Sequence, residues 1–234
     1  MSGAATSDWR SLGRTALEAR LGPQDEVSRV RVGVPSDLVR YLEPEVARAW
    51  DEALAAIAAE CRITTVQVPF DEEREIVTCL YRLGCNYAVS QVPRDEQNKL
   101  DPNLLSFLEP LRDLSTEQLL RLLRRREEIA GQAAALLVNE VDILLTPTMP
   151  CLPPRADAAS SGSDSNWLAW CPFTPFFNLS HGPALSVPWP GSGPGAFPIG
   201  LQVGSAPGRD GAAMAAASMI EALAAARSRQ RWIA

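Results

Sequence analysis

Side chains that could act as a general base or an activated nucleophile are few in this sequence of 234 residues. It contains one histidine, His181, and one lysine, Lys99, and its other basic residues are arginines, which cannot act as general bases near neutral pH. Lys99 lies in the polar segment DEQNKLDP, with no apolar setting that would lower the pKa of its amine. We therefore expect Lys99 to be a solvated surface residue.

Three arrangements could supply a nucleophile. Ser180 and His181 are adjacent, but neighbouring side chains usually diverge, and Ser–His chemistry needs a hydrogen bond between the two. Cys171 could pair with His181, and the sequence does not give their separation. Ser160 and Ser161 lie in a polar loop and not in a glycine-rich turn. For all three, a structural role is the stronger expectation.

Composition excludes several classes of function. The 22 basic residues against 28 acidic ones give a net charge of −6, which argues against a nucleic-acid or anionic-membrane partner. The five cysteines contain no C-x-x-C pair, so neither a disulfide framework nor a zinc site is indicated, and we expect no metal or cofactor. The first twenty residues lack a signal-peptide core, and 212–226 is too short to span a membrane. A cytoplasmic protein is the expectation.

The elements that would position these groups follow from periodicity. Residues 30–35 and 63–69 are rich in β-branched side chains and predict strands. The segment between them, with Pro44 near its first turn, predicts an amphipathic helix that carries Trp50. Such a unit favours a parallel sheet covered by helices. Residues 71–89 predict a second helix, which begins with the acidic run DEERE, and we expect that run to be solvated.

In the second half of the chain, a capping box and many prolines mark the ends of the predicted elements. An S-x-x-Q capping box at Ser115 predicts a long helix, whose arginines 124–126 should form an exposed face. DILLT at 142–146, cut off by Pro147, is typical of a strand buried on both faces. From there to residue 198, a window that holds 11 of the 19 prolines predicts long loops and the short strands 184–187 and 199–203. An Ala-rich helix should follow at 212–229.

In this order the segments resemble the C-terminal half of the amidase signature family. The resemblance rests on RVGVP followed by a helix, VDILLTPTMPCLPP, FTPFFNLSHGPALSVP and PIGLQV, and runs from about Arg29 to about Arg229. It implies an α/β fold with a mixed sheet flanked by helices, the C-terminal part of an amidase-signature fold. It also implies a heritage of hydrolysing carboxamides to acid and ammonia or amine. We expect residues 1–29 to form an extension, partly disordered or helical, and 30–234 to form the amidase-like domain.

The family's catalytic groups are the main departure. Members resemble one another in using a serine nucleophile, a bridging serine and a lysine, the serines in a Gly-rich stretch, all in the N-terminal half. The 29 residues before the first matching strand contain no lysine and no such serine pair, so we assign no catalytic residue. The glutamine-using members place an aspartate at the position that resembles Cys171, so recognition of glutamine in that way is not expected.

The substrate-binding prediction rests on two segments that lie near the cavity in the family. A buried strand that ends at a proline turn also places loop groups at a sheet edge. Asn178 could equally use its amide to fix the local backbone. The predicted substrate-binding residues are Thr146, Pro147, Thr148, Phe173 and Asn178.

Three hypotheses of function follow. The first is a truncated or split amidase that acts on C–N bonds other than peptide bonds, binds a small amide and needs a complementing catalytic half or a second copy. The second is a non-catalytic amidase-like binding or interaction protein, a pseudoenzyme. The third, and weakest, is a self-contained hydrolase that uses Cys171 or Ser180 with His181. The sequence leaves open whether this chain alone catalyses any reaction.

Overall fold

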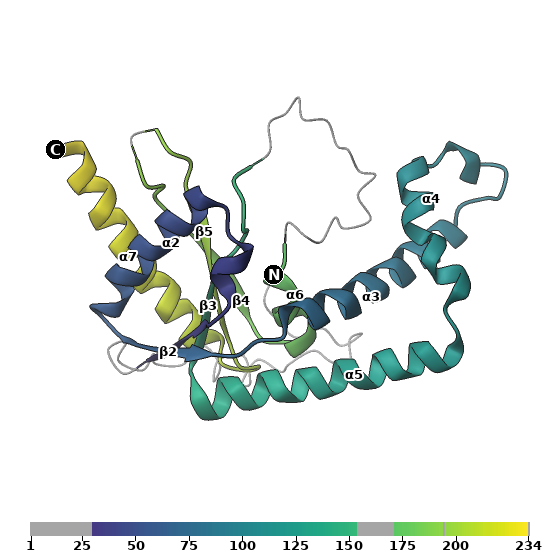
Figure 1. Cartoon of the computed structure of the whole chain (residues 1–234), viewed down its shortest axis with the longest axis horizontal. Coiled ribbons are helices and arrows are strands. Elements are labelled where there is room, and N and C mark those ends of the chain that lie inside the picture. The colour runs from purple at the N-terminus through teal and green to yellow at the C-terminus, as the bar shows by residue number, and fades with distance from the viewer. Residues whose placement is uncertain (1–29, 154–170, 194, 234) are drawn as a thin grey trace, which may run out of the picture.

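The computed structural model describes residues 30–153, 171–193 and 195–233, and its centre is a five-stranded mixed sheet (Figure 1). The strand order is β2-β1-β3-β5-β4. β1 runs parallel to β2 and β3, and β5 runs antiparallel to β3 and β4. The expected mixed α/β architecture is therefore confirmed. The strands are β1 (Arg31–Pro35), β2 (Arg62–Val66), β3 (Ile143–Pro147), β4 (Ala184–Trp189) and β5 (Ile199–Ser205).

Helices cover the sheet and extend beyond it. Figure 1 shows α2 and α7 beside the sheet on one side and α6 on the other, while α3 and α5 reach away from it and carry α4 at their far end. The α-helices are α2 (Pro44–Ala58), α3 (Phe70–Ser90), α4 (Pro102–Leu108), α5 (Thr116–Ala135), α6 (Thr174–Ser180) and α7 (Asp210–Ile233). The shorter turns are η2 (Leu38–Tyr41), η3 (Gln97–Lys99), η4 (Glu109–Asp113) and η5 (Leu136–Glu140), the last a π-helix that continues α5.

The main core lies between the sheet and the pair α2 and α7. Trp50 and Ile57 of α2 are almost completely buried, because the apolar positions of this helix recur on one face. Ala216 and Ile220 of α7 belong to the same core, and Arg227 of α7 forms an ion pair with Glu52 of α2. The Trp50 helix and the Ala-rich helix therefore both pack on the sheet.

The central strand β3 is buried at all five positions, as its uninterrupted apolar run predicts. Its start is tied to β1 by one carboxylate. Asp142 Oδ2 accepts hydrogen bonds from the backbone N of Arg31 at 2.9 Å and from Nε of Arg31 at 3.2 Å, and Oδ1 accepts from Nη2 at 3.2 Å. This contact sets where β1 and β3 begin beside each other.

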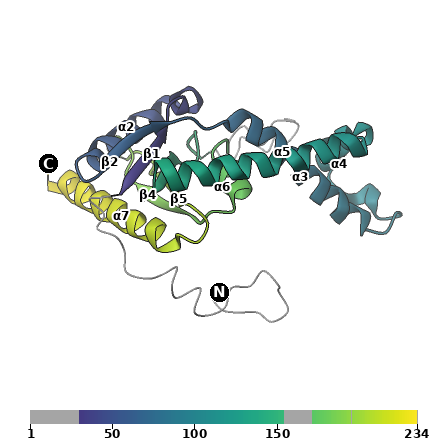
Figure 2. The same ribbon diagram turned by 90° about the horizontal axis from the view of Figure 1, so that it is seen from below.

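The arm formed by α3, α4 and α5 reaches away from the sheet (Figure 2) and has its own small apolar cluster. Ile76 of α3, Ile129 of α5 and Leu179 of α6 pack together. Arg125 of α5 also donates to Glu72 of α3, with Nη2 to Oε2 at 2.8 Å. The two long helices are therefore held to each other by both apolar and charged contacts.

Two helices lie in segments whose sequence pattern does not predict a helix. α4 begins with Pro102 in its first turn. Asp101 caps the helix, and its side chain accepts a hydrogen bond from the backbone N of Asn103. α6 lies inside the proline-rich window expected to form loops. Its Pro175 lies in the first turn, where a proline costs no helical hydrogen bond, and His181 ends the helix in the left-handed conformation, with φ of 56°.

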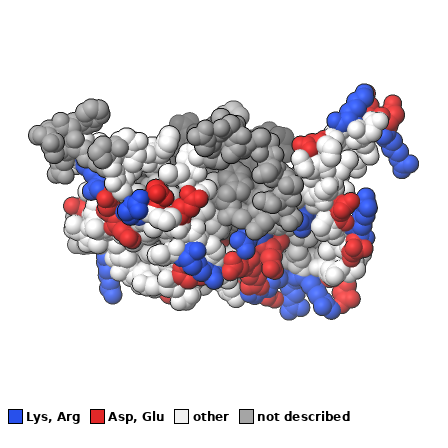
Figure 3. Space-filling model, turned by 45° about the horizontal axis from the view of Figure 1, so that its top comes forward, with Lys and Arg blue, Asp and Glu red and all other residues white. Residues whose placement is uncertain are grey.

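The charged surface is mixed in sign. On the face drawn in Figure 3, the side chains of Lys and Arg lie beside those of Asp and Glu and do not gather into a patch of one sign. Arg124 illustrates this, because its exposed guanidinium lies 3.4 Å from Glu128 one turn further along α5. Among the helices that the structure describes, none combines the length and the apolar character that a membrane crossing requires.

Candidate functional site

The sheet brings two of the predicted residues, Thr146 and Phe173, to one side chain. Thr146 of β3 lies opposite Gln202 of β5. The Nε2 group of Gln202 is placed for long hydrogen bonds of 3.4 Å to Thr146 Oγ1 and 3.4 Å to the carbonyl oxygen of Phe173. All three residues are buried. Gln202 therefore links the end of β3 to the start of α6.

Thr148 lies just beyond β3 and contacts a residue that the sequence analysis did not select. Its Oγ1 is 2.6 Å from Oγ of Ser186 on β4, although β5 runs between β3 and β4. The contact is possible because Gly200 lies between them: a Cβ there would be 2.7 Å from Thr148 Oγ1 and 2.8 Å from Ser186 Oγ. Ser186 is exposed and Thr148 is half-buried, so this hydroxyl pair is open to a ligand.

The remaining two predicted residues are placed differently. Pro147 is buried and pairs in register with Leu201, so its role is structural, as the last residue of β3. Asn178 is exposed on α6, between the buried Phe177 and Leu179. The structure thus gathers Thr146, Thr148 and Phe173 around β5 and leaves Asn178 at the surface. Their role in substrate binding stays a prediction.

The candidate nucleophile pair at the end of α6 is occupied by structural contacts. Ser180 is buried, and its Oγ accepts from the backbone N of Gly182 at 3.5 Å. Nε2 of His181 lies 3.0 Å from Nη2 of Arg126. Because a guanidinium only donates, the ring nitrogen must be the acceptor in this contact. The proton-accepting nitrogen of His181 is therefore engaged by Arg126.

The other candidates have settings that do not activate them. Burial raises the pKa of the Cys171 thiol, with a smaller opposing effect from Thr174, so the reactive thiolate is disfavoured. Lys99 is exposed and 3.6 Å from Glu96, as expected for a surface lysine. Ser160 and Ser161 lie outside the described residues. Within the described ranges, no group of three or more His, Cys, Asp or Glu side chains is placed to hold a metal ion.

The setting of Glu73 contradicts the prediction from its acidic run. That run predicts solvated side chains, yet Glu73 is 0% exposed and neither carboxyl oxygen has a hydrogen-bond partner. Burial, with a further contribution from the negative charge of Glu72, raises its pKa to about 8. A signal was present, because Glu73 lies three residues from both Phe70 and Ile76, on the buried stripe of α3.

Known proteins resemble this chain over most of its length. A 2-amino-5-chloromuconic acid deaminase from Comamonas testosteroni is 28% identical over 219 residues, which cover 84% of this chain and 44% of that protein. A solved structure described as an amidase superposes with a TM-score of 0.73 at 25% identity, covering 86% of this chain and 47% of the other. A 6-aminohexanoate cyclic dimer hydrolase, solved with its substrate, shares the fold with a TM-score of 0.71 at 19% identity, covering 95% and 51%.

The share of each protein that these matches cover, and the residues that a family model matches, assign this chain to a family. The chain spans about half the length of these relatives. The family model described as Amidase matches residues 7–214, which is most of the sequence. The chain therefore belongs to the amidase family.

Proposed function

We propose that this chain takes part in the hydrolysis of small carboxamides, at C–N bonds other than peptide bonds, as the half of an amidase that forms the substrate-pocket wall. In this proposal the serine nucleophile and the lysine base come from polypeptide outside these 234 residues. The observation that carries it is the Thr148–Ser186 hydroxyl pair, which lies just beyond the end of β3 within a chain of the amidase family.

The settings of the chain's own reactive groups support an external nucleophile. His181 is engaged by Arg126, Lys99 is an exposed ion-pair partner, and the thiol of Cys171 is held in its neutral form by burial. General-base and nucleophilic catalysis each need a group with a free lone pair. Contacts occupy His181 and Lys99, and burial disfavours the thiolate of Cys171.

The hydroxyl pair suits an amide substrate. A threonine and a serine hydroxyl can each donate to a carboxamide oxygen or accept from its NH₂ group. Thr146 and Phe173, both buried and hydrogen-bonded to Gln202, would fix the position of the residues that form the wall. Asn178, exposed on α6, would lie at its margin.

The partner in this proposal is a complementing catalytic half or a second copy of the chain. Among the described residues β4 pairs with β5 alone, so its outer edge offers unpaired backbone groups. Residues 184, 185, 186 and 188 of β4 are exposed as well. The competing proposal, a non-catalytic amidase-like interaction protein, uses the same edge without turnover. The cytoplasmic location stays a prediction from the sequence.

Ammonia release from a panel of aliphatic and aromatic amides tests the proposal. The purified chain alone should show no turnover above background. Addition of a polypeptide that carries the Gly-rich serine stretch and the lysine should produce it. In the complemented state Thr148→Val should raise KM by about tenfold through lost hydrogen bonding, whereas Thr64→Val, a matched change on β2, should have no effect.

The outcomes separate the three hypotheses. Turnover by the chain alone that disappears in Cys171→Ala or His181→Ala would establish the self-contained hydrolase and overturn our proposal. Binding of the added polypeptide without turnover would favour the interaction protein. Turnover with equal KM in Thr148→Val would remove the hydroxyl pair from the pocket wall.

A further inference from the structure

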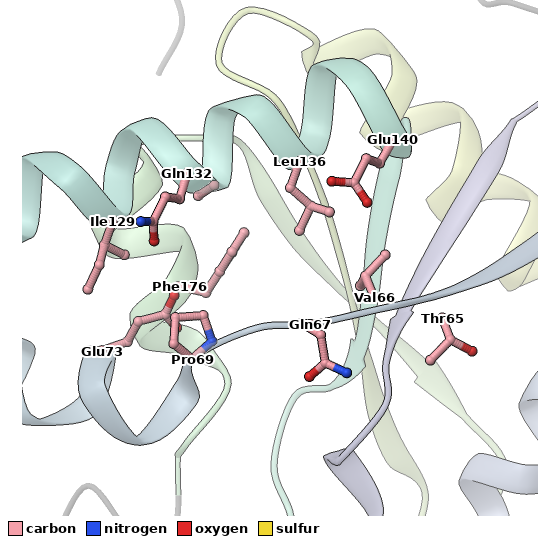
Figure 4. Close-up of a pocket in the computed structure, with 11 residues that line it drawn as sticks. Thr65, Val66, Gln67, Pro69, Glu73, Ile129, Gln132, Leu136, Glu140 and Phe176 are labelled. Atoms are coloured by element: carbon pink, nitrogen blue, oxygen red, sulfur yellow. The ribbon is translucent and has the colours of Figure 1, made fainter.

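A cleft of about 390 Å³ lies between the end of β2 and the helices α3 and α5 (Figure 4). None of the five predicted substrate-binding residues lines it. Its volume is in the range that holds a small organic molecule. This cleft is therefore a second candidate site, separate from the proposed pocket wall.

The walls of the cleft combine apolar surface with polar groups, none of which carries a positive charge. Ile129, Leu136 and Phe176 provide apolar surface. Figure 4 shows Glu73 and Gln132 projecting toward each other from facing helices, with Glu140 at the other end of the same space. No Lys, Arg or His is among the lining residues. The lining thus disfavours an anion and offers carboxyl and amide oxygens.

Glu73 is the observation that points to a ligand. A buried carboxyl group without a hydrogen-bond partner is costly to the folded state, and both oxygens of Glu73 are in this condition. An apolar residue at this position on the buried stripe of α3 would avoid that cost. The carboxyl lines the cleft, so a ligand in the cleft would supply the missing partner.

The neighbouring charges leave Glu73 without a counter-ion of its own. Glu72, next to it on α3, is paired with Arg125 of α5. Arg126 of α5 is engaged with His181 at the end of α6. Glu140, on η5, adds a second carboxyl group to the lining. Arg125 and Arg126 are thus engaged elsewhere, and neither is left to pair with Glu73 when its carboxyl group loses its proton.

We propose that this cleft binds a small organic cation, a primary amine with an apolar body, whose ammonium group donates to the carboxylate of Glu73. An ammonium group has three donors and no acceptor, which matches a carboxylate and the amide oxygen of Gln132. The apolar body would pack against Ile129, Leu136 and Phe176. The inference is independent of a complementing catalytic half, because every group belongs to this chain.

Binding of an amine requires a proton to leave the cleft. In the free protein the pKa of about 8 keeps Glu73 largely protonated near neutral pH. An ammonium ligand stabilises the carboxylate, so the carboxyl proton passes to the buffer while the amine remains protonated. Below the free pKa of Glu73, each bound amine should therefore release close to one proton.

Isothermal titration calorimetry with benzylamine tests this, with benzyl alcohol and benzoate as neutral and anionic ligands of similar shape. At about pH 6.5, titration in two buffers with different ionisation enthalpies should show release of about one proton per benzylamine. Benzyl alcohol should bind at least about tenfold more weakly, and benzoate should not bind. Glu73→Gln should weaken benzylamine binding by at least about tenfold and abolish the proton release.

The matched control is Glu75→Gln, a change of the same kind at an exposed position of α3, which should bind benzylamine as the parent chain does. Absence of benzylamine binding, equal binding of benzyl alcohol, or equal binding by Glu73→Gln would each overturn the proposal. Proton release is measured on the unmodified chain, so the proposal remains testable should Glu73→Gln fail to fold. Binding without any buffer dependence would overturn it as well.

Discussion

Glu72 and Glu73 are adjacent on α3, yet the carboxyl group of Glu72 is paired with Arg125 and that of Glu73 is buried without a partner. Hydrogen bonds from Arg125 lower the pKa of Glu72, whereas burial and the charge of Glu72 raise the pKa of Glu73 to about 8. A single step along a helix turns the side chain by about 100°, which moves it from the α5 contact to the buried stripe. The two neighbours therefore contribute to stability with opposite pH dependence.

Glu73 should make the folded chain less stable as pH rises. Between its ordinary pKa of 4.5 and the folded value of about 8, the folded state keeps a proton that the unfolded state loses. The contribution of this group is therefore fully present below the unfolded value and is lost as pH rises through the folded one, by up to about 1.4 kcal/mol per pH unit. Urea unfolding of the parent chain and Glu73→Gln from about pH 5 to pH 8 measures it.

The expected result is a flatter pH profile in Glu73→Gln. Glu75→Gln should keep the slope of the parent chain, because Glu75 is exposed on the same helix. Parallel profiles for the parent chain and Glu73→Gln would show that the buried carboxyl group does not retain its proton in the folded state.

Asp142→Asn should destabilise the junction of β1 and β3. Burial alone would raise the pKa of Asp142, but hydrogen bonds and charge from Arg31 lower it. Because both side chains are partly exposed, we expect a loss of only about 1 kcal/mol in the free energy of unfolding near neutral pH.

That loss should shrink in acid. A carboxyl group with a lowered folded pKa contributes stability above its ordinary value of 3.8, and the contribution disappears as pH falls through the folded value. Thermal unfolding of Asp142→Asn at neutral and acidic pH measures this, with Asp51→Asn at an exposed position of α2 as the control. An equal loss at both pH values would argue against the charge of Asp142 as the cause.

Gly204→Ala should loosen α6 from the sheet. A Cβ at this position would lie 1.9 Å from Cε1 of Phe177, so the ring must move. Overpacking of this kind costs about 1 to 3 kcal/mol. Phe177→Leu combined with Gly204→Ala should recover part of the loss in a double-mutant cycle followed by urea unfolding.

Gly131→Ala provides the opposite case. No atom lies within 4 Å of the Cβ that it would add, and Gly131 is within α5, so the change should stabilise by about 0.5 to 1 kcal/mol through helix propensity. A destabilised Gly131→Ala would show that space is not what distinguishes the two glycines.

The β4 edge should promote self-association in the absence of a partner. Size-exclusion chromatography with light scattering should give a mass above 25.3 kDa that rises with concentration. Ala184→Lys, which places a charge on the exposed face of this edge strand, should lower that mass, and Ala222→Lys on α7 should leave it unchanged. A cooperatively unfolding monomer at micromolar concentration would show that the edge needs no partner.

Local pattern was sufficient for much of the fold. The β-branched runs and the spacing of apolar residues predicted β1, α2 and β2, because a strand or an amphipathic helix shows its period within a few residues. The continuous apolar run DILLT predicted the buried central strand, and the capping box at Ser115 predicted the start of α5, where both reciprocal hydrogen bonds are present. The order of the motifs indicated the amidase family.

The contacts of the candidate site depend on strand register and on packing between elements, and a local sequence pattern predicts neither. Thr148 and Ser186 meet because two strands pair antiparallel to a third and a glycine leaves room between them. The proline-rich sequence around α6 does not predict a helix, because contacts with α3 and α5 stabilise this helix more than its own helix propensity does. The acidic run at the start of α3 looked solvated because the sequence shows charge but not which face of the helix is covered. Only the packing of α5 and α6 against α3 decided that Glu73 is buried, because burial depends on which elements meet in space.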